Sequence, residues 1–330
     1  MLIPNLKKLV EWMGLFPLFT LNRADMKDKF PILDEFAFHW SFLALDNDKN
    51  GFASCKVVVL PVPYDSTTSY HSGAKEGPRA IIEASRYLED YDLELDSEIS
   101  EVGIYTLPEL ESNVDSPFKM AERVTRVSKT VFESGKILAM FGGEHSISLG
   151  AISAAAEVHG NLSVLYLDAH GDLRDIYMGS NYSHACTARR ILEIVPVVEV
   201  GVRSISKEEM EFYHSSKSDN LDIYFCEQTA HAREWNVDAI VEKLTENVYI
   251  SIDLDVLDPS LMSAVGTPEP GGLDWETITY LINTVCMKRN VVGFDIVELC
   301  PPVGPDSCAF IAAKLAYKIM GYITSLDNKR

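Results

Sequence analysis

The sequence predicts an α/β fold built around a mostly parallel sheet, and three observations support this prediction. Short apolar runs such as LSVLYLD (162–168) lack polar alternation, which indicates strands buried on both faces. Segments with helical periodicity separate these runs at short spacing, as in βαβ units with right-handed crossovers. Several runs end in Asp or His, at the strand ends where open parallel sheets bind their ligands.

The strands are predicted from runs rich in Val, Ile and aromatic residues. The first begins at Lys56, and Pro61 and Pro63 end it because proline cannot donate to a β-ladder. Six more are predicted at 136–141, 162–168, 197–202, 223–226, 248–255 and 291–297.

Helices are predicted where apolar residues recur every three to four positions between capping or breaking residues. Pro78 opens the first helix, and Gly135 ends the second. Ser146 is the predicted N-cap of the third, which Gly160 ends. The predicted helices are 79–87, 116–135, 147–159, 184–193, 206–215, 237–244, 275–288 and 308–323. The acidic segment 90–101 is expected to form an exposed ribbon or loop.

Length and composition predict one globular domain with a short appendage. The chain has 330 residues, of which 47% are hydrophobic and 24% charged. No linker-like segment divides residues 51–330, so we expect a single domain there and an N-terminal extension over residues 1–50. The apolar stretch 9–21 faintly resembles a signal peptide, but Glu11 and Pro17 interrupt it. No run reaches the ~18 apolar residues of a membrane span, so no membrane partner is expected.

Net charge and cysteine content limit which partners, metal motifs and cellular location we expect for this protein. The formal net charge of −20 leaves no basic face, so we expect no nucleic-acid partner. An acidic field favours cationic ligands and metal ions, although a solvated acidic surface is the simpler interpretation. The six cysteines include no C-x-x-C pair, which excludes zinc-ribbon and thioredoxin motifs. Reduced thiols and a cytoplasmic location are the expectation for a chain of this length.

Three predicted strand ends carry candidate metal ligands. In DAHGD (168–172) the polar residues alternate, so their side chains point the same way on an extended chain. A second run ends in two aspartates that are two residues apart, and a third run is followed by a histidine. The candidate ligands are His145, Asp168, His170, Asp172, Asp253 and Asp255.

These ligand types predict a two-metal hydrolytic site. Four carboxylates in one pocket repel one another unless cations balance them, and two divalent ions would supply four positive charges. Oxygen donors with two imidazoles suit Mn²⁺, with Zn²⁺ and Fe²⁺ as alternatives. Two such ions can share a water and lower its pKa. Taken singly, each Asp is more often a turn residue or cap, and each His a structural residue; the joint pattern is what carries the prediction.

Three motifs resemble the signatures of the ureohydrolase family, which includes arginases and agmatinases. They are GGEHS (142–146), DAHGD (168–172) and SIDLDVLDP (251–259). The resemblance covers nearly all of 57–323, and VGTPEPGGLDW (265–275) and GFDIVELCPP (293–302) look most like agmatinases. The departure is Glu144, where many relatives have Asp, and either acid could serve beside the ligand His145.

The resemblance implies a three-layer α/β/α arginase-like fold with a mostly parallel eight-stranded sheet and two Mn²⁺ per subunit. Its motifs assign one metal to His145, Asp168, Asp172 and Asp253, and the other to His170, Asp168, Asp253 and Asp255. In the family a metal-bridging hydroxide attacks the guanidinium carbon and releases urea and an amine. Relatives form trimers or hexamers, so the resemblance also implies a homo-oligomer.

Three residues receive catalytic roles from the same resemblance. Asp172 would orient the hydroxide, Glu298 would bind the planar guanidinium through paired hydrogen bonds, and His184 would protonate the leaving amine. Without the family context, Glu298 is equally well explained by a salt bridge at a strand end. His184 is likewise explained as a neighbour of a helix N-cap.

The expected substrate is a small cationic guanidine, foremost agmatine, which would give urea and the polyamine precursor putrescine. The arginase pattern is absent, because Arg174 stands where arginases carry an Asn. Asp175 could face the ammonium of agmatine, unless it forms a structural salt bridge. Arg174 leaves guanidinobutyrate open as an alternative, and N1-aminopropylagmatine and arginine are further candidates for the same chemistry.

Other functional classes have weaker support in the sequence. A two-metal phosphatase is chemically allowed, but only Arg174 and Arg203 are candidates to bind phosphate near the metals. A ureohydrolase-like binding protein without activity would lack a metal ligand or Glu298, and every such position is filled. No His-His pair supports the deacetylase branch of the fold, and no G-x-G-x-x-G motif supports a dinucleotide site.

Overall fold

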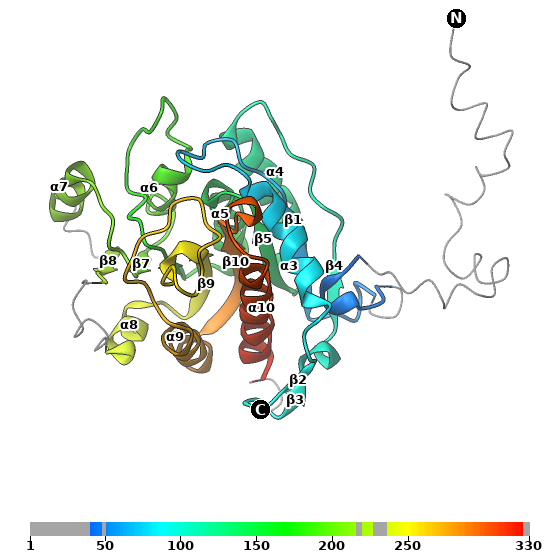
Figure 1. The fold of residues 1–330 in the computed structure, drawn as a ribbon. Coiled ribbons are helices and arrows are strands. Elements are labelled where there is room, and N and C mark those ends of the chain that lie inside the picture. The colour runs from blue at the N-terminus through cyan, green and yellow to red at the C-terminus, as the bar shows by residue number, and fades with distance from the viewer. Residues whose placement is uncertain (1–39, 48–50, 216–219, 227–235, 326–330) are drawn as a thin grey trace, which may run out of the picture.

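A computed structural model describes residues 40–47, 51–215, 220–226 and 236–325. An eight-stranded sheet, in which every pair of neighbouring strands is parallel, forms the centre of the molecule (Figure 1). In order of pairing its strands are β4 (Ile104–Thr106), β1 (Val57–Val62), β5 (Ile137–Gly142), β10 (Asn290–Val297), β9 (Asn247–Asp253), β6 (Leu162–Leu167), β7 (Val197–Val200) and β8 (Leu221–Tyr224). The predicted α/β class with a mostly parallel eight-stranded sheet is confirmed.

Helices cover both faces of the sheet, because its strands bury apolar side chains on both sides. One face packs against α3 (Gly77–Ser85), α8 (Val237–Lys243), α9 (Trp275–Lys288) and α10 (Ser307–Ser325). The other packs against α4 (Pro117–Glu133), α5 (Ser148–His159), α6 (Thr187–Ile191) and α7 (Lys207–Ser215). The resulting three layers hold the strand ends in fixed positions, which matters for the site below.

The structure departs from the predicted elements at a few places. Strand β4 was not predicted, since a three-residue edge strand carries too little pattern to stand out from a loop. Ser146 does not cap α5; its hydroxyl donates to Glu144 instead, 2.5 Å away. Strand β9 ends at Asp253, and Asp255 lies in a 3₁₀ turn. The predicted helix 184–193 is a 3₁₀ turn, His184–Cys186, followed by the short α6.

Part of the predicted N-terminal extension packs on the main body. Phe42 is buried with its ring 5.5 Å from that of Phe141, and its amide donates to the Thr106 hydroxyl. Residues 1–39 and 48–50 lie outside the described ranges. Within those ranges, no helix combines the length and apolar character needed to cross a bilayer. All six cysteines are buried, and no disulfide joins them in the described part of the chain.

The acidic segment after α3 forms a short antiparallel ribbon, β2 (Tyr91–Asp92) with β3 (Ser97–Glu98), as predicted. A buried ammonium ties this ribbon to α10. Lys318 Nζ lies 3.0 Å from both carboxylate oxygens of Asp92 and 2.6 Å from Glu94. Burial opposes ionisation of Asp92, but Lys318 and the local backbone amides hold the pKa of that carboxyl below its ordinary value.

We expect Lys318→Met to destabilise the fold by about 3–5 kcal/mol, since it leaves the buried Asp92 carboxylate without its cation. Chemical denaturation at neutral pH measures this loss, and adding Asp92→Asn should recover part of it. The difference should shrink as pH falls through the lowered pKa of Asp92, because protonation removes the ion pair from the parent protein too. An unchanged denaturation midpoint in Lys318→Met would contradict the prediction.

Candidate metal centre and active site

Four adjacent strands bring the candidate ligands together at the carboxyl edge of the sheet. The order β5–β10–β9–β6 places the turn after β5, which carries His145, next to the ends of β10, β9 and β6. Asp253 closes β9, and Asp168 directly follows β6. The register pairs Leu167 with Ile252, so those two aspartates lie side by side. Parallel pairing therefore converts three distant motifs into one cluster.

The cluster contains two groups of side chains that could each hold a metal ion. In one, ligand atoms of His145, Asp168 and Asp253 lie within 4.8 Å of one another; in the other, so do those of Asp168, His170 and Asp255. Asp168 belongs to both groups, as a bridging ligand would. Nδ1 of His145 is 3.1 Å from Asp168 Oδ2, 3.4 Å from Asp253 Oδ2 and 3.7 Å from Asp172 Oδ2. The structure thus brings together all six predicted ligands.

The electrostatics of this cluster fit a cation. Burial, and then the charge of neighbouring carboxylates, raises the pKa of Asp172 and Asp253 well above the ordinary value. Burial disfavours the charged forms of His145 and His170 as well, yet the surrounding carboxylates raise the pKa of both. A bound cation would relieve the repulsion among these carboxylates. Carboxylate oxygens with imidazole nitrogens are a donor set that suits two divalent ions such as Mn²⁺.

A hydrogen-bonded chain behind His145 fixes which ring nitrogen faces the cluster. Ser251 Oγ donates to Asp295 Oδ1 at 2.8 Å, so it can only accept from the His145 Nε2–H, 2.9 Å away. In the neutral ring the lone pair is therefore on Nδ1, where it can bind a metal in place of the proton, and outer partners orient ligating histidines in this way. Sequence reasoning missed Ser251 and Asp295. Their signal is position, since Ser251 precedes Asp253 by two residues on the same face of β9.

Tyr166 is a second residue that sequence reasoning missed. Its ring stacks on the ring of His145 with centroids 4.4 Å apart and an interplanar angle of 6°. Its hydroxyl donates to Asp172 Oδ2 at 2.9 Å. Burial, and then the charge of Asp172, raises the pKa of Tyr166 well above its usual range, so the phenol keeps the proton it donates. Tyr166 lies on the same face of β6 as Asp168, and it contacts the two candidate ligands His145 and Asp172.

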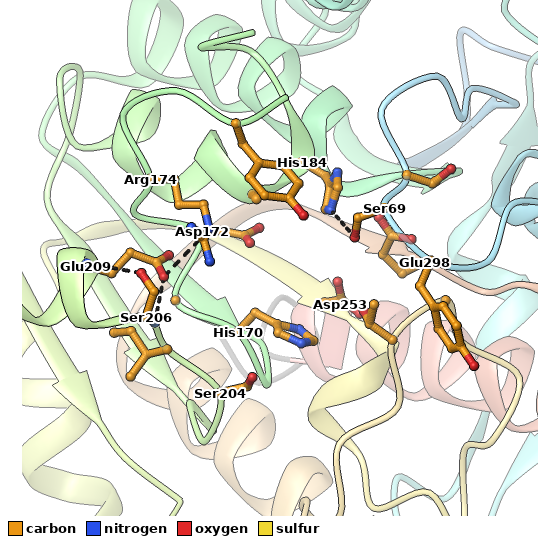
Figure 2. A pocket seen from close by; sticks show the side chains of 18 of the residues that line it. Ser69, His170, Asp172, Arg174, His184, Ser204, Ser206, Glu209, Asp253 and Glu298 are labelled. Atoms are coloured by element: carbon orange, nitrogen blue, oxygen red, sulfur yellow. Dashed lines mark hydrogen bonds and ion pairs between the residues drawn. The ribbon is translucent and has the colours of Figure 1, made fainter. Parts of the chain in front are cut away.

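A cavity of about 280 Å³ lies next to the cluster, and the predicted catalytic residues line it (Figure 2). Its wall includes His170, Asp172, His184, Asp253 and Glu298. The remaining lining comes mainly from the loops after β1, β6 and β7: Thr68, Ser69, Tyr70, His71, Gly171, Arg174, Tyr177, Ala185, Ser204, Ile205, Ser206 and Glu209, with Gly266 and Thr267. Side chains that can transfer protons or form ion pairs therefore line a single cavity.

Glu298 and His184 both line this space, and in Figure 2 they lie on either side of Ser69. Glu298 directly follows β10 with a φ of 64°, and its Oε1 accepts from the amide of His145 at 2.7 Å. Burial, and then the charge of Glu144, raises the pKa of Glu298 to about 8. Burial, and then repulsion from His170, lowers the pKa of His184 to about 4. His184 is therefore neutral near pH 7 and able to take up a proton.

The two candidate substrate-binding residues, Arg174 and Asp175, lie in different surroundings. Asp175 is exposed, pairs with Arg190 Nη2 at 2.7 Å and does not line the cavity. Arg174 does line it, over the Tyr177 ring at 5.0 Å, with its Nε 3.9 Å from Glu209 Oε2. Glu209 was not predicted, because nothing in its local sequence separates it from the neighbouring surface acids. The charge of Arg174 is thus balanced within the cavity wall.

Arg203, the other arginine considered as a phosphate ligand, is used structurally. Its guanidinium donates to backbone carbonyls of Asp255, Val256 and Glu269 at 2.6, 3.3 and 2.8 Å. These bonds occupy its donors and hold together the loops around the candidate metal ligands. The phosphatase alternative therefore has no free arginine from this position.

Comparisons with known proteins agree with this geometry. A family model described as "Arginase family" matches residues 55–321, which include every residue that lines the cavity. The chain is 38% identical to N(1)-aminopropylagmatine ureohydrolase of Synechocystis sp. over 286 residues, 84% of this chain and 92% of that protein. It is 36% identical to agmatinase of Pyrococcus horikoshii over 271 residues, 80% of this chain and 90% of that protein. The crystal structure of agmatine ureohydrolase of Thermoplasma volcanium matches with a TM-score of 0.80 and 31% identity, covering 90% of this chain and 99% of that one.

Proposed function

The chain belongs to the arginase family, and from this premise we propose that it is a ureohydrolase that releases urea from agmatine or its N1-aminopropyl derivative. The observation that carries the proposal is the placement of Glu298 and His184 in one cavity with His170, Asp172 and Asp253. A guanidinium needs a planar anionic partner, a nucleophile and a proton donor for the leaving amine. Glu298 can supply the first, since nearby divalent ions and the guanidinium itself would lower its pKa again, and His184 can supply the last.

The nucleophile requires the metals. Bound divalent ions lower the pKa of a water and so make hydroxide available at neutral pH. His145, Asp168 and Asp253 would hold one ion, and Asp168, His170 and Asp255 the other, with Asp172 beside the first. We propose Mn²⁺ for both positions, because the ligand set is rich in oxygen.

The protein residues divide the remaining work. Glu298 accepts two hydrogen bonds from the guanidinium and fixes the carbon in front of the nucleophile. Asp172, held by the Tyr166 hydroxyl, accepts a hydrogen bond from that nucleophile and orients it. His184 carries a proton to the leaving nitrogen. In this scheme urea and a protonated amine are the products.

The cavity favours a cationic rather than an anionic tail. Arg174, which would attract a carboxylate such as that of guanidinobutyrate, is already faced by Glu209. N1-aminopropylagmatine has specific support as a second substrate, because the Synechocystis relative carries its name. The exposed Tyr70 ring at the cavity rim offers an aromatic surface to a longer alkylammonium tail. A homo-oligomer of three or six subunits and a cytoplasmic location remain predictions.

Urea release by the Mn²⁺-loaded protein tests the proposal. Agmatine, N1-aminopropylagmatine, guanidinobutyrate and arginine are compared at equal concentration, each with a chelated control. We expect urea from the first or second substrate, lost on chelation and restored by Mn²⁺. Urea from arginine or guanidinobutyrate alone would contradict the cationic tail, and release of phosphate from a phosphomonoester without any urea would favour the phosphatase alternative.

A further inference from the structure

The loop after β1 contains a threonine that joins two parts of the site. Thr67 is half-buried, and its backbone amide and hydroxyl both reach Glu144, at 2.5 Å to Oε2 and 2.8 Å to Oε1. The same hydroxyl accepts from the backbone amide of His184 at 3.0 Å and lies 3.2 Å from its ring nitrogen Nδ1. Thr67 thus connects the residue preceding a metal ligand to the proposed proton carrier.

Glu144 is held as an acceptor. Its two oxygens receive the amides of Ser66 and Thr67, the Thr67 hydroxyl and the Ser146 hydroxyl, all between 2.5 and 2.8 Å. Two of these donors are backbone N–H groups, which cannot reverse direction. Both of these N–H groups bind Oε2, and Oε1 of the ionised carboxylate has no proton to donate, so the Thr67 hydroxyl gives its proton to Oε1.

Counting protons then decides the state of the His184 ring. A hydroxyl has one proton and two lone pairs. Thr67 gives its proton to Glu144 and one lone pair to the His184 amide, so only the second lone pair is left to face Nδ1. A lone pair facing Nδ1 favours the tautomer in which Nδ1 carries the ring proton and donates it to Thr67, and Ser183 Oγ at 3.3 Å can accept the same proton.

We propose that Thr67 is a positioning residue that keeps the proton of the neutral His184 ring on Nδ1, so that Nε2 is the atom that exchanges protons with the substrate. Nε2 lies on the cavity side, 3.4 Å from Ser69 Oγ (Figure 2). Tyr177 meets the ring edge-on, with centroids 5.9 Å apart. The low pKa of His184 agrees with a neutral ring at rest.

The catalytic consequence rests on the proposed function. The water that adds to the guanidinium carbon releases one proton to Nε2. Nε2 passes this proton to the leaving nitrogen, which keeps the electron pair of the broken C–N bond. The second proton of the added water leaves the new urea carbonyl for the amine. A ring with its proton on Nε2 could not accept in the first step.

The experiment combines nuclear magnetic resonance with kinetics on the full chain. Long-range ¹H–¹⁵N spectra of ¹⁵N-histidine-labelled protein at neutral pH report which ring nitrogen is protonated, and His184→Asn identifies the signal. We expect protonated Nδ1 in the parent protein and in Thr67→Ser, but not in Thr67→Val. In Glu144→Gln the amide nitrogen would donate to Thr67, which frees the Thr67 proton for Nδ1 and moves the ring proton to Nε2.

Urea release by the metal-loaded variants gives the second readout. Thr67→Val should lower kcat about 10- to 100-fold, less than most of the 10²–10⁴-fold that general acid–base catalysis contributes, because His184 itself remains, with little change in KM. Thr67→Ser should restore it. Ser66→Ala is the matched control, since that hydroxyl contacts Tyr64 and not His184.

Protonated Nε2 in the parent protein would overturn the proposal whatever the kinetics. Equal ring state and equal kcat in Thr67→Val and the parent would overturn it as well. Failure of the proposed function looks different: no guanidine would yield urea, while the spectra would still show protonated Nδ1 that depends on Thr67. The two failures are therefore distinguishable.

Discussion

Asp168→Asn is expected to abolish binding of one metal ion and to lower urea release by more than about 100-fold, the upper end of what outer partners of a metal site contribute. Asp168 is the residue shared by both candidate metal groups, and its carboxylate lies next to both histidines. An amide removes one negative charge and offers a single good oxygen donor, so it cannot bridge two cations.

Metal content measured after dialysis against a known free Mn²⁺ concentration checks this result independently of activity. Asp238→Asn is the matched control, because it makes the same change at an exposed carboxylate that pairs with Lys288. The control should keep two ions and full activity. Two tightly bound ions in Asp168→Asn would refute the shared position of this residue.

Glu298→Gln should retain both metals and lose turnover. The amide oxygen of glutamine can still accept from the His145 amide, so the metal ligands keep their places. The guanidinium, however, loses a buried charged partner. Such a loss costs about 2–5 kcal/mol, or roughly 30- to 5,000-fold in kcat/KM.

Titration of metal content and steady-state kinetics on the same preparation separate the two roles of Glu298. Glu109→Gln is a suitable control, since its carboxylate belongs to a surface pair with Arg79. Loss of metal from Glu298→Gln would place this residue among the metal ligands. Unchanged kcat/KM would remove it from the substrate site.

The sequence was sufficient for the fold class and for predicting which residues the fold brings together as candidate metal ligands. Both depend on local pattern: a strand buried on two faces must be apolar throughout, and a parallel sheet collects the residues that follow its strands at one edge. His145, Asp168 and Asp253 could therefore be placed together although they are far apart in the chain. The edge strand β4 escaped prediction, because three residues do not establish a pattern.

The tertiary structure decided the hydrogen-bond partners around that cluster. Ser251 reaches His145 across 106 positions, and Thr67 reaches His184 across 117. Tertiary packing also pairs the exposed Asp175 with Arg190 and places Arg174 beside Glu209. These contacts depend on distances of 2.7 to 3.9 Å between side chains from different strands and loops. Local periodicity says which face a residue lies on, but only the packed layers bring a particular donor within reach of a particular acceptor.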